Sequence, residues 1–65
     1  MFGTKLKELR VEKDISTTEM AAILGVTPRS YNYYERGDRF PRVDIFISIC
    51  KTLNCTPNDL LLPFD

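Results

Sequence analysis

Histidine is absent from this 65-residue sequence, and cysteine is scarce, with only Cys50 and Cys55. Without histidine the chain can form neither a Ser/His/Asp triad nor a Cys/His nucleophile pair, and it offers no imidazole ligand for a metal. Two thiols cannot complete the four-ligand sphere of a structural zinc site, so we interpret them as small buried apolar side chains. We therefore expect no metal, no cofactor, no small-molecule substrate and no enzymatic activity.

Long apolar runs and an excess of one charge are also missing. No run approaches the ~20 residues of a membrane-spanning helix, and the N-terminus has no apolar signal-peptide core, so we expect a cytoplasmic protein that does not enter a membrane. Nine basic and nine acidic residues give a formal net charge of zero. The composition is 43% hydrophobic and 28% charged, which is typical of a globular chain, and its length predicts a single domain over residues 1–65.

The spacing of apolar residues is helical throughout, and turn-forming residues divide the chain into five short helices. The first is expected over residues 4–13. Ser16 and Glu19 have the spacing of a capping box, in which each residue satisfies a backbone N–H of the other, and this predicts the start of a second helix. Gly25 predicts its end, because glycine adopts the left-handed conformation at helix C-termini.

Thr27 and Pro28 predict the start of a third helix, since threonine is a good N-cap and proline fits the first helical position. Gly37 predicts its end. A fourth helix is expected over residues 43–53, and a last turn opens at Pro57. The predicted fold is thus an all-α, compact five-helix domain.

The inward face of the fourth helix follows from ~100° of rotation per residue. A stripe centred on Phe46 takes in Val43, Ile49, Cys50 and Leu53. Ile45 and Ile47 fall outside that arc, so we expect them away from the core.

The pair of helices around Gly25 carries the functional information. Two short helices joined by a tight glycine-containing turn have helix-turn-helix geometry, and the second helix then projects an outer face that fits the major groove of B-DNA. Geometry alone leaves a second interpretation open, because any small all-helical domain contains such a hairpin.

Sequence similarity adds to this geometry. The segments over residues 6–10, 16–27, 34–37 and 49–61, with Pro41, resemble the phage-repressor/Cro-type helix-turn-helix family, in one ungapped register over nearly the whole chain. The resemblance implies a lambda-repressor-like DNA-binding domain with its helix-turn-helix at the second and third helices. It also implies a transcriptional regulator, commonly dimeric, with the third helix in the major groove.

The resemblance places the base-contacting positions on the outer face of the third helix. They are Pro28, Arg29, Asn32 and Tyr33. The Arg29 guanidinium can donate two hydrogen bonds to guanine, and the Asn32 amide can pair with adenine. Tyr33 can contact a thymine methyl or a phosphate, or instead pack against protein. Ser30, Tyr31 and Tyr34 are expected to point inward.

Phosphate contacts are expected at the helix N-termini and in the loop after the third helix. The candidates are Thr17, Thr27, Arg36, Arg39 and Arg42. Many family members have glutamine where this chain has Thr17, whose shorter side chain weakens that assignment. Residues 27–42 carry four arginines against two acidic residues, so a net neutral chain can still present one basic face to DNA.

Arg10 and Glu35 are expected to form a partly buried structural pair, as in family members that have both. The resemblance further implies a homodimer on a palindromic operator, and the surplus apolar residues Ile45, Leu62 and Phe64 are the candidate interface. Covering the base of the core is the other role open to Leu62 and Phe64.

Two functions follow from the sequence. The first is a sequence-specific transcriptional regulator that binds double-stranded DNA, of the phage-like or mobile-element repressor type. The alternative is a protein-binding adaptor, anti-repressor or antitoxin-like module on the same fold, which the zero net charge, Tyr33 and Thr17 favour.

Overall fold

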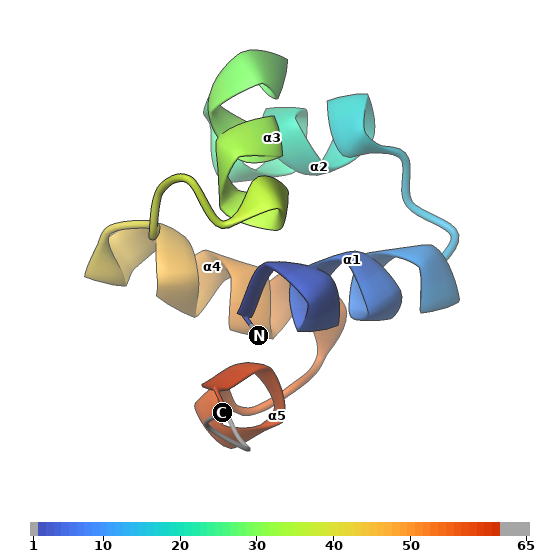
Figure 1. The fold of residues 1–65 in the computed structure, drawn as a ribbon. Helices are drawn as coiled ribbons and strands as arrows, with labels where there is room; N and C mark the ends of the chain where they lie inside the picture. The colour runs from blue at the N-terminus through green and yellow to red at the C-terminus, as the bar shows by residue number, and fades with distance from the viewer. Residues whose placement is uncertain (1, 62–65) are drawn as a thin grey trace.

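A computed structural model describes residues 2–61, and all regular structure within them is helical. The helices are α1 (Phe2–Glu12), α2 (Thr17–Leu24), α3 (Pro28–Arg36), α4 (Val43–Leu53) and α5 (Pro57–Leu61) (Figure 1). The all-α, five-helix prediction is confirmed, although α1 begins two residues earlier and ends one residue earlier than expected. None of the helices within residues 2–61 is long and apolar enough to cross a membrane.

The predicted caps fix the ends of α2. The Ser16 hydroxyl accepts a hydrogen bond from the Glu19 backbone N–H at 3.0 Å, and the Glu19 carboxylate accepts one from the Ser16 N–H at 3.1 Å. Gly25 ends the helix with a φ of 73°, in the left-handed region that glycine adopts without a Cβ clash. The capping box and the glycine stop are therefore both confirmed.

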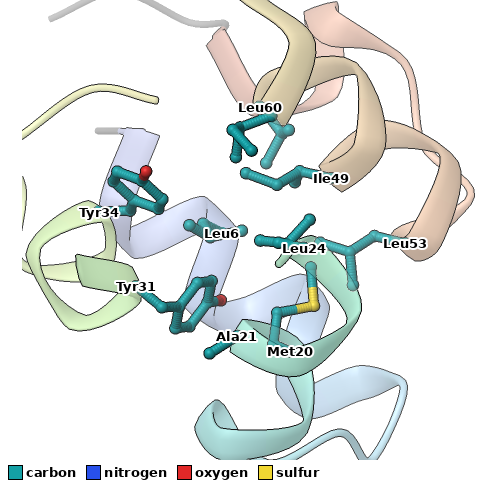
Figure 2. Packing of buried hydrophobic residues seen from close by; sticks show 10 residues of the cluster. Leu6, Met20, Ala21, Leu24, Tyr31, Tyr34, Ile49, Leu53 and Leu60 are labelled. Atoms are coloured by element: carbon teal, nitrogen blue, oxygen red, sulfur yellow. The ribbon is translucent and has the colours of Figure 1, made fainter. Parts of the chain in front are cut away.

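The helices form two tiers with α5 beneath them. In Figure 1, α2 and α3 lie above α1 and α4, and α5 lies below. Buried side chains converge from all five helices in the close view of Figure 2. They are Leu6, Met20, Ala21, Leu24, Tyr31, Tyr34, Ile45, Ile49, Leu53 and Leu60. This shared core holds the α2–α3 pair in a fixed position on the rest of the domain.

The predicted inward face of α4 is wrong by about 60°. The buried stripe runs through Ile45, Ile49 and Leu53, so Ile49 is its centre in place of Phe46. Val43, expected in the core, is 75% exposed, whereas Ile45, expected outside it, is 9% exposed. Apolar residues surround most of α4, so periodicity alone does not determine which of them packs inward.

Phe46 lies on one flank of α4, where its ring packs against two other aromatic rings. Its centroid lies 5.9 Å from that of Phe2 and 5.6 Å from that of Phe40. This cluster joins the start of α1, the α3–α4 loop and α4. With Phe46 on this flank, Ile45 faces the core, and it does not offer the free surface expected of a dimer contact. The other two candidate interface residues, Leu62 and Phe64, lie outside the described residues.

Gly3 allows α1 to approach the end of α3 closely. A Cβ atom on Gly3 would lie 2.3 Å from the backbone oxygen of Glu35 and 2.9 Å from that of Tyr34. Any side chain there would push the two helices apart, because real Cβ atoms do not come so near a backbone oxygen. The contact sets how far α3 stands above α1.

Candidate nucleic-acid interface

The turn between α2 and α3 is short and held by backbone and side-chain hydrogen bonds. Three residues separate the helices, and the Val26 N–H donates back to the Ala21 carbonyl at 3.0 Å. The Thr27 hydroxyl accepts a hydrogen bond from the Ser30 N–H at 3.1 Å, and Pro28 occupies the first helical position, where no N–H is needed. The turn and its caps thus set the direction in which α3 leaves α2.

The two faces of α3 differ sharply in exposure. Tyr31 and Tyr34 are buried in the core. On the opposite face four of the predicted DNA-contacting residues are exposed: Thr27, Pro28, Arg29 and Asn32. Tyr33, also predicted there, is half-buried, and so is Ser30, which was expected inside. The helix therefore presents a polar ridge to solvent while its tyrosines anchor it.

A charged network attaches the inner side of α3 to α1. The Arg10 Nε donates to the Glu35 carboxylate at 2.5 Å, and its Nη1 donates to the Ile15 carbonyl at 2.6 Å. The Tyr31 hydroxyl donates to the same carboxylate at 2.5 Å. Both ionic side chains are 10% exposed, so Arg10 and Glu35 form a largely buried pair away from solvent.

The pKa values of two members of this network, Arg10 and Tyr31, are raised. The hydrogen bond to Glu35 raises the pKa of Arg10, so the guanidinium stays charged. Burial, followed by the hydrogen bond to Glu35, raises the pKa of the Tyr31 phenol, so it stays protonated and remains a donor. The Glu35 carboxylate is paired with Arg10 inside the fold, so it does not oppose an anion on the outer face of α3.

Three of the predicted arginines gather around Tyr33. The Arg29 Nε donates to the Tyr33 hydroxyl at 3.1 Å. The guanidinium carbons of Arg36 and Arg39 lie 5.8 Å and 5.1 Å from the centroid of the Tyr33 ring, within the ~6 Å range of cation–π attraction. The helical period places Arg29 and Arg36 beside Tyr33, four residues before it and three after it on α3. The position of Arg39 depends on how the α3–α4 loop folds back, which the sequence pattern does not indicate.

Arg42 makes its contact elsewhere. It occupies the N-cap position of α4, where its Nη2 lies 3.4 Å from the Asp44 carboxylate, and both side chains are largely exposed. Arg36 likewise has an exposed partner, Asp38, at 3.1 Å. Exposed pairs of this kind contribute little to stability, so a phosphate can compete for either arginine.

The N-terminus of α2 is less suited to an anion than the sequence suggests. Thr17 is the first residue of the helix and is half-buried. The Glu19 carboxylate already lies at this end, and its hydrogen bonds to Ser16 lower its pKa, so it carries a negative charge there. A carboxylate and a phosphate compete for the same positive end of the helix dipole. Thr17 is therefore the weakest of the phosphate candidates.

A helix-turn-helix family model matches residues 6–60. The chain belongs to the helix-turn-helix family. No cluster of three or more metal-ligating side chains occurs within residues 2–61.

Curated relatives of the chain carry the names of transcriptional regulators. It is 35% identical over 51 residues to the cryptic phage CTXphi transcriptional repressor RstR of Vibrio cholerae, covering 78% of this chain and 46% of the relative. It is 34% identical over 61 residues to the SPbeta prophage-derived uncharacterized HTH-type transcriptional regulator YonR of Bacillus subtilis, covering 94% and 56%.

A third relative also carries the name of a regulator. The chain is 40% identical over 47 residues to the putative HTH-type transcriptional regulatory protein PF1851 of Pyrococcus furiosus, covering 72% of this chain and 15% of the relative. The chain thus spans about half the length of its bacterial relatives and much less of the archaeal one. No solved structure matches it significantly.

Proposed function

We propose that this chain is a sequence-specific DNA-binding transcriptional regulator of the phage-like repressor type, which contacts the major groove with α3. The observation that carries the proposal is the split character of α3, with buried tyrosines on one face and an exposed polar ridge with clustered arginines on the other. Family membership and the repressor and regulator names of the relatives support the same function.

The base contacts come from the exposed ridge. Arg29 donates to guanine through its terminal nitrogens, which remain available when its Nε is bonded to Tyr33. Asn32 pairs with adenine, and Pro28 supplies an apolar surface without a donor. Tyr33, the fourth base contact predicted from the sequence, is half-buried, and its hydroxyl accepts a hydrogen bond from Arg29, so its role is separate from theirs.

The phosphate contacts surround that ridge. Arg36 and Arg39 flank it at the end of α3 and in the following loop, and Arg42 lies further along at the start of α4. Thr27 and, more weakly, Thr17 contribute hydroxyl groups at the N-termini of α3 and α2. These contacts neutralise phosphates and make binding dependent on salt.

The proposed DNA target is a palindromic operator, bound by a homodimer. A small module buries little surface on DNA, and reading two half-sites about 34 Å apart multiplies its affinity. Ile45 is not proposed as a contact, because it is buried in its own core. Val43 and Ile47, one turn apart on α4, are 75% and 48% exposed and supply an apolar face. Sedimentation should show a dimer that Val43→Glu weakens; a strict monomer that binds DNA singly would refute this part.

The regulatory mechanism proposed is steric. A protein bound at an operator blocks polymerase, and this needs neither a cofactor nor catalysis. The place of action is the cytoplasm of a cell without a nucleus, where the DNA lies.

Retention on immobilised random duplex DNA, measured as the salt concentration rises, tests the function. The proposal predicts retention at low salt and elution with a steep salt dependence, weakened by Arg39→Gln. Lys51→Gln, a matched loss of one exposed positive charge on α4, is the control and should elute close to the parent. Absence of retention at low salt would contradict the proposal.

A protein-binding role is the second candidate, favoured by exposed apolar residues. Phe40 is 59% exposed, and its ring centroid lies 4.7 Å from that of Phe2; Val43, three residues further along the chain, is 75% exposed. Absence of DNA retention would favour this function over the first.

A further inference from the structure

The side chain of Tyr33 contacts three guanidinium groups on the proposed DNA-binding face. Its hydroxyl accepts from the Arg29 Nε at 3.1 Å, four residues earlier on the same helix. Its ring lies 5.8 Å from Arg36 and 5.1 Å from Arg39, measured from the centroid to the guanidinium carbon. The hydroxyl and the ring therefore contact different arginines.

The backbone of Tyr33 also fixes the loop that carries Arg39. The Tyr33 carbonyl accepts hydrogen bonds from the N–H groups of Asp38 at 2.9 Å and Arg39 at 3.3 Å. This places Arg39, six residues further along the chain, back over the ring of the same tyrosine. The half-buried position of Tyr33 keeps the ring itself from moving freely.

Arginines held in this way lose less freedom on binding than arginines in solvent. A long exposed side chain samples many rotamers, and ordering it on a ligand weakens binding. Like charges also repel one another, and the negative face of an aromatic ring offsets part of that repulsion. With its Nε bonded to Tyr33, Arg29 keeps its two terminal nitrogens as a fork that fits the O6 and N7 atoms of guanine.

We propose that Tyr33 is a positioning residue, whose hydroxyl orients Arg29 for base recognition and whose ring holds Arg36 and Arg39 for the phosphates. This rests on the proposed function of α3. In this role Tyr33 affects DNA binding through the three arginines and does not itself contact a base.

A double-mutant cycle separates positioning from direct contact. Tyr33→Phe removes only the hydroxyl, and we expect a 2- to 10-fold loss in discrimination between a selected operator and random duplex, on the order of the cost of ordering one side chain. In an Arg29→Ala background the same substitution should have no effect on discrimination, because the hydroxyl has lost its partner. An equal loss in both backgrounds would show that the hydroxyl contacts DNA itself and would overturn the proposal.

Two further variants control for the fold and for the ring. Tyr34→Phe removes a hydroxyl from the inward face of the same helix and should leave discrimination unchanged. Tyr33→Leu removes the aromatic face as well, and we expect it to lower affinity for random duplex by about 2- to 5-fold beyond Tyr33→Phe. Equal affinities of the Leu and Phe variants for random duplex, at equal melting temperatures, would overturn the part of the proposal that concerns Arg36 and Arg39.

A measurement on the free protein tests the positioning of Arg29 by Tyr33 without DNA, and therefore independently of the proposed DNA-binding function. The Nε–Hε group of Arg29 gives its own NMR signal, which is assigned because it disappears in Arg29→Lys. We expect the Hε hydrogen to exchange with water several-fold faster in Tyr33→Phe than in the parent protein. Unchanged exchange would overturn the hydroxyl's positioning role even if DNA binds. If the parent protein binds no DNA, the proposed function fails, and the positioning of Arg29 is still decided by this exchange.

Discussion

Arg10 is a charged residue with 9% of its surface exposed, and each of the three nitrogens of its guanidinium donates a hydrogen bond to an acceptor in the fold. Glu35 and the Ile15 carbonyl surround it, and Tyr31 completes the carboxylate's hydrogen bonds. The residue types and their family resemblance were enough to predict the Arg10–Glu35 pair. The contributions of Tyr31 and Ile15 were not predictable, because they depend on how α1 and α3 cross.

Replacing Arg10 by methionine should destabilise the fold by about 3 kcal/mol, because it leaves the Glu35 carboxylate buried without its counter-charge. Urea unfolding followed by circular dichroism measures this. Arg36→Met, which removes an exposed arginine from the end of α3, is the matched control and should change stability by less than about 0.5 kcal/mol. Unchanged stability of Arg10→Met together with an altered base preference would mean that Arg10 contacts DNA.

Cys55 should be a slow nucleophile at neutral pH. Burial, followed by the neighbouring Cys50, raises the pKa of the Cys55 thiol to about 11. A raised thiol pKa favours the protonated form, so only about 0.1% is reactive thiolate at pH 8. Alkylation by iodoacetamide should therefore accelerate about tenfold per pH unit until near pH 10. Mass spectrometry of tryptic peptides measures it, since cleavage after Lys51 separates the two cysteines; a plateau by pH 9 would contradict the raised pKa.

At the scale of helices, the ends were predictable and the rotation of one helix was not. Ser16, Gly25 and Thr27 act through their own backbone neighbourhood, so the sequence contains all the information that defines them. The inward face of α4 depends on partners far away in the chain. Phe2 and Phe40 hold Phe46 at the flank, and Ile49 takes the centre that periodicity gave to Phe46.

The contact of α1 with α3 at Gly3 predicts a change in stability opposite in sign to the one usual for a glycine-to-alanine substitution in a helix. In an exposed helix, alanine is more favourable than glycine by about 1 kcal/mol. At Gly3 the new methyl group would meet the Glu35 backbone oxygen at 2.3 Å, so we expect Gly3→Ala to destabilise the protein by about 1–3 kcal/mol. Thermal unfolding measures the change, with Thr4→Ala, at an exposed position of α1, as the control. A stabilised Gly3→Ala protein would show that the helices do not approach so closely.

For the whole molecule, the placement of charge matters more than its total. The formal net charge is zero, yet Arg29, Arg36 and Arg39 meet around one tyrosine while Glu35 is paired inside the fold. The sequence predicted which arginines belong near α3. It did not predict that Arg39 returns to the ring of Tyr33 or that Arg42 pairs with Asp44, because the conformation of the α3–α4 loop decides both.

The measurement that tests the α3 assignment most directly compares the parent protein with Arg29→Ala on a duplex selected from random DNA and on a scrambled duplex, at one salt concentration. A bidentate arginine–guanine contact contributes about 1–3 kcal/mol of discrimination, so Arg29→Ala should lose roughly 5- to 150-fold in preference for the selected site. Arg36→Ala, a phosphate-contact control, should weaken both duplexes about equally. If selection enriches no sequence, or if Arg29→Ala discriminates as well as the parent, α3 does not read DNA bases through Arg29.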